Sequence, residues 1–329
     1  MKHLLIIVAV ATTLIFTGCK ESIGFYQNTF RSAVFTQDYT SAKYDFLWVM
    51  DNSASMTDRR NFVKDNMESF LNTLGSRKAI DYQMAVVTTD YFTERGALVA
   101  APDGMTVVKS TSPNPVADFA AIVANIKDSG TSFWEQGLES SYQAVYKNGK
   151  TFMREGVPLI VIYVTDENDW SCKDECWGNE PEHNTHWVAF DTSRYINYFK
   201  NVKKSENSEV SIFPIVGTSA SQCELASLGT KYSDLSSQVG NLGVSGSICN
   251  SDLEASYNGI ARVIADRGTI FKLDTVASGQ RINVYIDGTL VPFSPENYIF
   301  DVASNSIIFT GAAPKKGQIV EVTYSQKVN

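Results

Sequence analysis

Short, almost fully apolar runs alternate with amphipathic segments along most of the chain, from residue 44 to residue 273. Residues 44–50, 82–89 and 157–165 form three such runs, a pattern typical of parallel strands that are buried on both faces. Other segments place apolar residues at helical spacing. We expect helices at residues 57–74, 116–126, 133–146, 186–202 and 251–267, and further strands at 209–216 and 269–273. This alternation predicts a doubly wound, mostly parallel α/β sheet.

The pattern changes from residue 281 onward, where apolar and polar residues alternate as they do in half-buried strands. The dipeptide Asp287-Gly288 is a strong signal for a two-residue hairpin turn. Further strands are expected at residues 298–302, 306–310 and 319–324. We therefore expect an α/β domain at residues 44–274 and a small all-β module at residues 275–329.

The N-terminus begins with an uncharged apolar run at residues 4–16, directly before Thr17-Gly18-Cys19. The run is too short to span a bilayer as a mature helix, but its length suits the apolar region of a signal peptide. Small residues directly before a cysteine resemble a bacterial lipoprotein processing site. The resemblance implies a signal peptide at residues 1–18 and a lipid anchor on Cys19. Ordinary secretion, with Cys19 merely nearby, is the alternative.

The same resemblance implies a cellular location. The residue after Cys19 is Lys20 rather than aspartate, which in enterobacteria-like sorting points to the outer membrane. We therefore expect a lipoprotein of the cell envelope, held in the outer membrane and facing either the periplasm or the outside. Residues 19–43 are polar and weakly patterned, and we interpret them as a tether between the anchor and the first strand.

The composition narrows the classes of partner. The chain has 28 Lys and Arg against 36 Asp and Glu, a formal net charge of −8. Nonspecific binding to nucleic acid requires basic side chains that neutralise phosphates, so we expect no nucleic-acid partner. A hydrophobic content of 43% is ordinary for a globular protein and argues against wholesale disorder.

Four cysteines remain when Cys19 is set aside. An even number in an exported protein predicts disulfides, and local spacing favours Cys172–Cys176 and Cys223–Cys249 among the three possible pairings. A zinc site is the alternative, because Cys172-x3-Cys176-x6-His183-x2-His186 has suitable ligand types at roughly suitable spacing.

The chemistry-bearing motif is Asp51-Asn52-Ser53-Ala54-Ser55, at the expected carboxyl end of the first strand. Ligands of open α/β sheets bind just outside such strand ends. A carboxylate and two hydroxyls on alternate loop residues can converge on one hard cation, which prefers oxygen ligands. Asp and Ser are also common in turns and helix caps, so the motif alone is weak. Thr131, in a Gly-Thr pair before a helix, and Asp166, after the most apolar strand, could reach the same rim.

Together, these five residues resemble the metal-ion-dependent adhesion site of von Willebrand factor A domains. That family presents Asp-x-Ser-x-Ser after the first strand, a threonine from a Gly-Thr loop, and an aspartate after a later strand. The matching residues are Asp51, Ser53, Ser55, Thr131 and Asp166. The resemblance covers roughly residues 40–273 and implies that residues 44–274 are such a domain with an intact site. The Gly-Thr loop is longer here than in many members.

The resemblance also extends to segments near the site. Bacterial lipoproteins with such a domain carry Thr-Thr-Asp after the second strand, here ending in Asp90, and an acidic run after the metal aspartate, here Glu167-Asn168-Asp169. Asp90 could accept a hydrogen bond from a metal-bound water or could cap a helix. Glu167 and Asp169 could add to the metal's field, form a separate calcium loop, or only solvate the surface, which we favour.

The family's metal is usually Mg²⁺, with Mn²⁺ or Ca²⁺ as substitutes, and its protein ligands commonly offer an Asp or Glu carboxylate to the cation. The resemblance therefore implies a metal-dependent binding protein that acts in adhesion or complex assembly. A structural scaffold lipoprotein, in which the metal only stabilises the fold, is the alternative. We expect no enzyme, because the sequence lacks a Gly-x-Ser-x-Gly elbow, a phosphate-binding Gly-x4-Gly-Lys loop and a His-Glu-x2-His helix.

Overall fold

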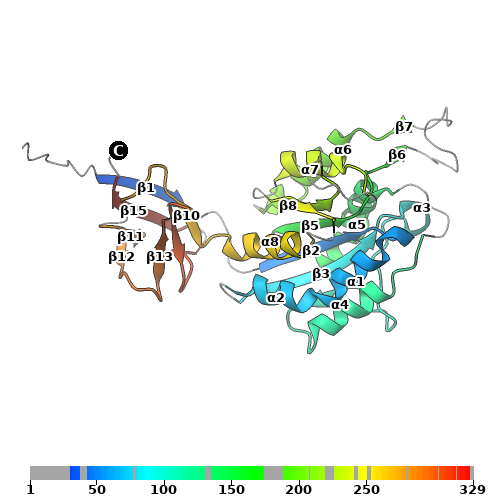
Figure 1. Ribbon diagram of the computed structural model, residues 1–329, viewed down its shortest axis with the longest axis horizontal. Coiled ribbons are helices and arrows are strands. Elements are labelled where there is room, and N and C mark those ends of the chain that lie inside the picture. Colours follow the sequence, from blue (N-terminus) through cyan, green and yellow to red (C-terminus); the bar gives the residue numbers. More distant parts are fainter. Residues whose placement is uncertain are drawn as a thin grey trace, which may run out of the picture.

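The computed structural model describes residues 30–37, 43–76, 79–129, 135–173, 188–206, 208–218, 226–240, 244–249, 253–278, 281–302, 304–315 and 317–326. These residues form two units, an α/β domain and a smaller β-rich module (Figure 1). Helix α8 (Leu253–Asp266) ends the α/β domain and leads into the module. No helix within the described ranges has both the length and the hydropathy to span a membrane.

A six-stranded sheet forms the centre of the α/β domain, with the strand order β4-β3-β2-β5-β8-β9. All neighbouring strands are parallel except for β3 and β4, which are antiparallel. The expected mostly parallel central sheet is therefore confirmed. The strands are β2 (Lys43–Met50), β3 (Asp81–Thr88), β4 (Val108–Lys109), β5 (Leu159–Val164), β8 (Val210–Val216) and β9 (Gly246–Ser247).

Helices cover both faces of this sheet, because the central strands are apolar on both faces and must be shielded from water on each. Alternate side chains of β2 point to opposite faces: Phe46 and Trp48 join one hydrophobic cluster, and Leu47 and Val49 join the other. The first cluster packs under α1 (Thr57–Asp65), α2 (Met67–Leu74), α4 (Pro115–Ala124) and α8. The second packs under α5 (Gly137–Phe152), α6 (Thr192–Asn201) and α7 (Thr230–Val239).

The helices differ from the sequence-based expectation in several places. The helix expected at residues 133–146 runs from Gly137 to Phe152, and the helix expected at residues 186–202 begins at Thr192, after strand β7 (Val188–Ala189). The single helix expected at residues 57–74 is divided at Asn66 into α1 and α2. Asn66 donates its side-chain amide to the carbonyl oxygen of Phe62 at 2.8 Å, a local hydrogen bond of the kind by which Asn competes with a continuous helix. Helix α7 was not expected. The short elements η1 (Ala54–Met56), α3 (Tyr91–Glu94), η2 (Lys204–Glu206), β6 (Cys172–Lys173) and β7 (Val188–Ala189) complete the domain.

The C-terminal module contains two antiparallel sheets, with the orders β1-β15-β11-β12 and β10-β14-β13. The expected hairpin is confirmed: Asp287 and Gly288 both have positive φ, at 48° and 77°, and connect β11 to β12. The strands are β10 (Ile270–Lys272), β11 (Asn283–Ile286), β12 (Thr289–Val291), β13 (Tyr298–Asp301), β14 (Ser306–Phe309) and β15 (Ile319–Ser325).

Strand β1 (Phe30–Thr36) corrects the expected domain division. Its residues were assigned to a polar tether at residues 19–43, but they pair antiparallel with β15 along seven positions. Ala33 is buried and Phe35 packs against the module's core, while Phe30 and Val34 face outward. Similarly, β10 was placed in the α/β domain but pairs with β14. The α/β domain is therefore an insertion between two parts of the β-rich module.

Candidate metal-binding site

Two aspartates follow the neighbouring parallel strands β2 and β5. Asp51 comes directly after Met50, which pairs with Val164, and Asp166 lies two residues beyond Val164. Asp51 donates its backbone N–H to the carbonyl oxygen of Val164 at 3.0 Å, and its Oδ2 accepts a hydrogen bond from Thr165 Oγ1 at 2.6 Å. Both aspartates are almost fully buried, with exposed fractions of 0% and 1%. The parallel register thus brings both carboxyl groups to one edge of the sheet.

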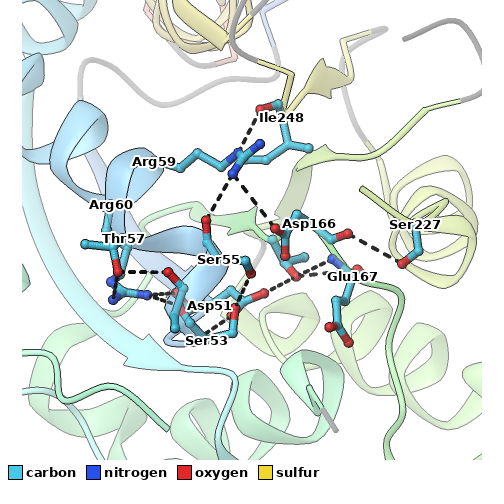
Figure 2. Close-up of polar contacts among 12 residues, drawn as sticks. Asp51, Ser53, Ser55, Thr57, Arg59, Arg60, Asp166, Glu167, Ser227 and Ile248 are labelled. Carbon is cyan, nitrogen blue, oxygen red and sulfur yellow. Dashed lines mark hydrogen bonds and ion pairs between the residues drawn. The ribbon is translucent and has the colours of Figure 1, made fainter. Parts of the chain in front are cut away.

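The loop after β2 supplies hydroxyl groups to the same edge (Figure 2). Asp51 Oδ1 accepts the backbone N–H of Ser53 at 2.8 Å, which turns the chain back over the carboxylate. Ser53 Oγ and Ser55 Oγ lie 2.9 Å apart and share a hydrogen bond. Asp51, Ser53, Ser55 and Asp166 therefore converge as the sequence predicts.

The fifth predicted ligand, Thr131, lies outside the described residues, but the start of its segment lies against the loop after β2. Ser129 donates its backbone N–H to the carbonyl oxygen of Asn52 at 3.0 Å. Asn52 in turn donates its side-chain amide to the carbonyl oxygen of Lys127 at 2.9 Å. These contacts hold residues 127–129 against the loop after β2.

Asp166 is a buried carboxylate that accepts few contacts from the groups around it. Both of its side-chain oxygens lack a hydrogen-bond partner among the described residues. Its nearest described ion-pair partner is Arg59, whose Nη1 lies 3.9 Å from Asp166 Oδ2. Burial raises the pKa of Asp166, and the nearby Ser55 hydroxyl and the Arg59 guanidinium partly oppose that rise. Buried polar groups usually have hydrogen-bond partners, so a carboxylate without one is suited to bind a cation.

Charges on neighbouring carboxyl groups add to the effect of burial in raising pKa values at this edge of the sheet. Burial raises the pKa of Asp51, opposed by hydrogen bonds from Thr165 and Ser53 and increased by the charge of Asp166. Burial, together with the charges of Asp51 and Asp166, raises the pKa of Glu167 to about 7. No group of three or more His, Cys, Asp or Glu side chains in the described ranges is placed to hold a metal. A cation bound between Asp51 and Asp166 would have two carboxylates and the hydroxyl oxygens of Ser53 and Ser55 as donors, a set that suits Mg²⁺ or Mn²⁺.

Two consecutive arginines, Arg59 and Arg60, support the loop from beneath, and neither was expected from the sequence pattern. Arg60 Nη1 donates to the carbonyl oxygens of Asp51 at 2.9 Å and Ser53 at 2.8 Å, while its Nη2 pairs with Asp128. Arg59 Nη1 donates to the carbonyl oxygen of Ser55 at 3.0 Å (Figure 2). Both arginines are buried although they lie in the first turns of α1. Together they fix the backbone that presents the predicted ligands.

Three acidic residues near the site have roles that the structure identifies. Asp90 caps α3 by accepting the backbone N–H of Thr93 at 2.9 Å. Asp169, which we expected to solvate the surface, is 2% exposed and accepts the backbone N–H of Leu138 in the first turn of α5 at 2.9 Å. Glu135 accepts a hydrogen bond from Thr89, and burial raises its pKa to about 9. Asp169 and Glu135 thus fix the first turn of α5 and the residues directly before it.

The cysteine-based predictions fall largely outside the described residues. Cys172 and Cys249 are buried, at 7% and 4% exposure. Their expected partners Cys176 and Cys223 lie outside the described ranges, as do His183, His186 and Cys19. The disulfide pairing, the zinc alternative and the lipid anchor therefore stay predictions.

Comparison with known proteins gives distant structural similarities. No protein-family model matches the sequence, and no curated protein matches it. The open form of the pilus adhesin SpaC from Lactobacillus rhamnosus GG is 11% identical, with a TM-score of 0.44, over 91% of this chain and 41% of that chain. A von Willebrand factor type A protein from Catenulispora acidiphila is 13% identical, with a TM-score of 0.43, over 91% and 66%. The pilus adhesin RrgA from Streptococcus pneumoniae is 10% identical, with a TM-score of 0.36, over 91% and 58%.

The chain spans 41% to 66% of the length of these three proteins.

The fold and the site together define a mixed α/β protein. Its central sheet is mostly parallel, antiparallel sheets form a second unit, and two buried aspartates lie at the carboxyl ends of adjacent strands.

Proposed function

We propose that the α/β domain is a metal-dependent binding module of the von Willebrand factor A type. Asp51, Ser53, Ser55, Thr131 and Asp166 would hold one divalent cation, Mg²⁺ or its substitutes Mn²⁺ and Ca²⁺. The observation that carries the proposal is the buried carboxylate of Asp166, whose two oxygens have no hydrogen-bond partner in the described part of the chain, beside the equally buried Asp51.

The supporting argument is one of charge balance. Burying a carboxylate without a partner is costly, and two buried carboxylates beside each other increase that cost. Thr165 and the Ser53 amide each donate to Asp51, but these neutral donors supply no compensating charge. A bound dication supplies that charge and an open coordination position for a further oxygen ligand.

The partner we propose is a protein that offers an Asp or Glu side chain. Ser53 is half-buried and Ser55 is exposed, so the hydroxyl side of the site faces solvent while the aspartates lie beneath it. A ligand carboxylate could therefore approach from the hydroxyl side without displacing the buried residues. With the anchor expected at Cys19, the protein would act in adhesion or complex assembly at the outer membrane, as a binder rather than an enzyme.

Calorimetric titration with Mg²⁺, Mn²⁺ and Ca²⁺ tests the metal site. Wild-type protein should bind at least one of these cations, and Asp51→Ala should bind none, because the hydroxyls and the single remaining carboxylate of Asp166, which lies beside Arg59, are too weak to hold a hard dication. The matched control is Asp58→Asn, which removes an exposed carboxylate from the first turn of α1. If wild type binds none of the three cations, or if Asp51→Ala binds them equally well, the proposal is wrong.

Capture from an envelope fraction, in Mg²⁺ and in chelator, tests the binding role. A partner retained by wild type in Mg²⁺ and lost both in chelator and with Asp51→Ala supports the proposal. If metal binds and stabilises the protein but capture is the same in chelator, the metal has a structural role and the scaffold alternative is correct.

A further inference from the structure

Arg59 and Arg60 are adjacent in sequence and equally buried, but only one of them lies beside a predicted metal ligand. Arg60 contacts backbone carbonyls of the loop and the carboxylate of Asp128, and it forms no ion pair with Asp51 or Asp166 among the described contacts. Arg59 Nη1 lies 3.9 Å from Asp166 Oδ2. Two residues of the same type therefore have different electrostatic relations to the site.

The Arg59 guanidinium is held in place at two further points. Its Nη1 donates to the carbonyl oxygen of Ser55 at 3.0 Å, and its Nε donates to that of Ile248 at 3.3 Å (Figure 2). Its side chain is 9% exposed, and a guanidinium stays protonated at all ordinary pH values. The positive charge is thus a fixed part of the site.

The 3.9 Å separation leaves Asp166 available to a cation. The contact is longer than a hydrogen bond, and both Asp166 oxygens lack a hydrogen-bond partner among the described residues. Arg59 therefore offsets part of the negative charge of Asp51 and Asp166 without occupying their ligand positions. The two aspartates carry two negative charges when ionised, and Arg59 reduces the net charge of the three residues to −1.

We propose that Arg59 sets the balance between cation and ligand affinity at this site, because its fixed charge weakens cation binding and makes the metal-loaded site one unit more positive toward an acidic ligand. This inference rests on the proposed metal site. With a bound dication, the three residues and the metal sum to +1, and without Arg59 they sum to zero. Removing Arg59 lowers the local charge by one unit whatever charge the other acidic groups carry.

Arg60 provides the matched control with the opposite sign. Its hydrogen bonds fix the carbonyl oxygens of Asp51 and Ser53, so its loss loosens the backbone that presents both ligands. Arg60→Gln should therefore weaken cation binding. Arg59→Gln keeps a side-chain amide that can donate to the carbonyl oxygen of Ser55, and it should tighten cation binding because repulsion between the guanidinium and the cation is removed.

The test is calorimetric titration of the full chain with Mn²⁺ alone, in low salt, for wild type, Arg59→Gln, Arg59→Met, Arg59→Lys and Arg60→Gln. We expect about tenfold tighter binding for Arg59→Gln and Arg59→Met, the factor that a change of about 1.4 kcal/mol in repulsion produces. Arg59→Lys keeps the charge and should stay near wild type, and Arg60→Gln should bind more weakly.

Acetate serves as the acidic probe. Its binding to the Mn²⁺-loaded protein displaces metal-bound water and lowers the relaxation enhancement of water protons. We expect acetate to bind several-fold more weakly to Arg59→Gln than to wild type. If the folded, charge-removing variants bind Mn²⁺ no more tightly than wild type, or bind acetate equally well, the inference is overturned. If wild type binds no Mn²⁺, the proposed function itself fails.

Discussion

Replacing Asp166 by asparagine should change the stability of the protein in opposite directions with and without metal. Asn keeps the shape of the side chain and removes its charge. In chelator, wild type carries a carboxylate that is 1% exposed, has no hydrogen-bond partner in the described residues and lies beside Asp51. We therefore expect metal-free Asp166→Asn to be as stable as wild type or more stable, by up to about 2 kcal/mol, the scale of one unsatisfied buried polar group.

Metal should reverse the order. A cation at a hundredfold its dissociation constant stabilises wild type by about 2.7 kcal/mol, while the variant, lacking one of two carboxylate ligands, should gain little. For a domain of this size, 1 kcal/mol corresponds to roughly 2–4 °C in Tm. The melting curves of the two proteins should therefore cross between chelator and saturating Mn²⁺.

Differential scanning calorimetry of both proteins, in chelator and over a Mn²⁺ series, measures this crossing. Asp58→Asn should follow wild type in both conditions and so controls for the loss of a nearby charge. A variant that is clearly less stable than wild type in chelator would show that the ion pair between Arg59 and Asp166 outweighs the cost of burying the carboxylate, which contradicts the prediction. An equal Mn²⁺ shift in both proteins would show that the cation binds elsewhere.

Three further predictions concern pH, cysteines and the anchor. Burial raises the pKa of Glu135 to about 9, so the metal-free folded protein binds more protons than the unfolded chain, and its stability should fall as pH rises from about 4.5 toward 9. Urea titrations in chelator should show a smaller fall in stability for Glu135→Gln than for wild type. An unchanged dependence on pH would contradict the assignment to Glu135. Peptide mapping without reductant should find the disulfides Cys172–Cys176 and Cys223–Cys249. The second disulfide closes the longer loop and should contribute on the order of 3 kcal/mol to the free energy of unfolding. Four free thiols, or stoichiometric zinc, would rule out this pairing. Cys19→Ser should abolish labelling by a fatty-acid analogue and release the protein from the membrane fraction, since acyl chains contribute about 0.8 kcal/mol per buried methylene; unlabelled wild type would end the lipoprotein interpretation.

The central strands and most of the predicted ligands could be read from the sequence because their signals are local. A parallel strand buried on both faces is apolar at nearly every position, so β2 and β5 are visible without knowledge of their partners. Asp51 and Asp166 directly follow such strands, and parallel pairing then places them at one edge of the sheet. The hairpin at Asp287-Gly288 is equally local, since both residues adopt positive φ.

Features that depend on contacts between distant parts of the chain could not be predicted from the sequence. Strand β1 has exposed apolar residues at Phe30 and Val34, and its partner β15 lies at the other end of the described chain. Arg59 lies in the first turn of a helix, where arginine usually faces water, and only the fold brings Asp166 and Ile248 to it. The sequence pattern around Asp169 is typical of a solvated loop. In the structure, α5 packs against this loop, and Asp169 accepts the backbone N–H of Leu138.

The pairing of β1 with β15 has a consequence for synthesis of the chain, because the two strands are far apart in sequence. A hydrogen bond between Arg31 and Gln326 joins residues 295 positions apart, so a chain made from its N-terminus holds β1 without its partner until β15 has been made. The α/β domain can complete its six-stranded sheet during that time, because every strand of that sheet lies between the two partners. Non-local strand pairing is slow, and an unpaired edge invites aggregation. The connectivity therefore allows the domain with the candidate site to fold before β15 closes the β-rich module.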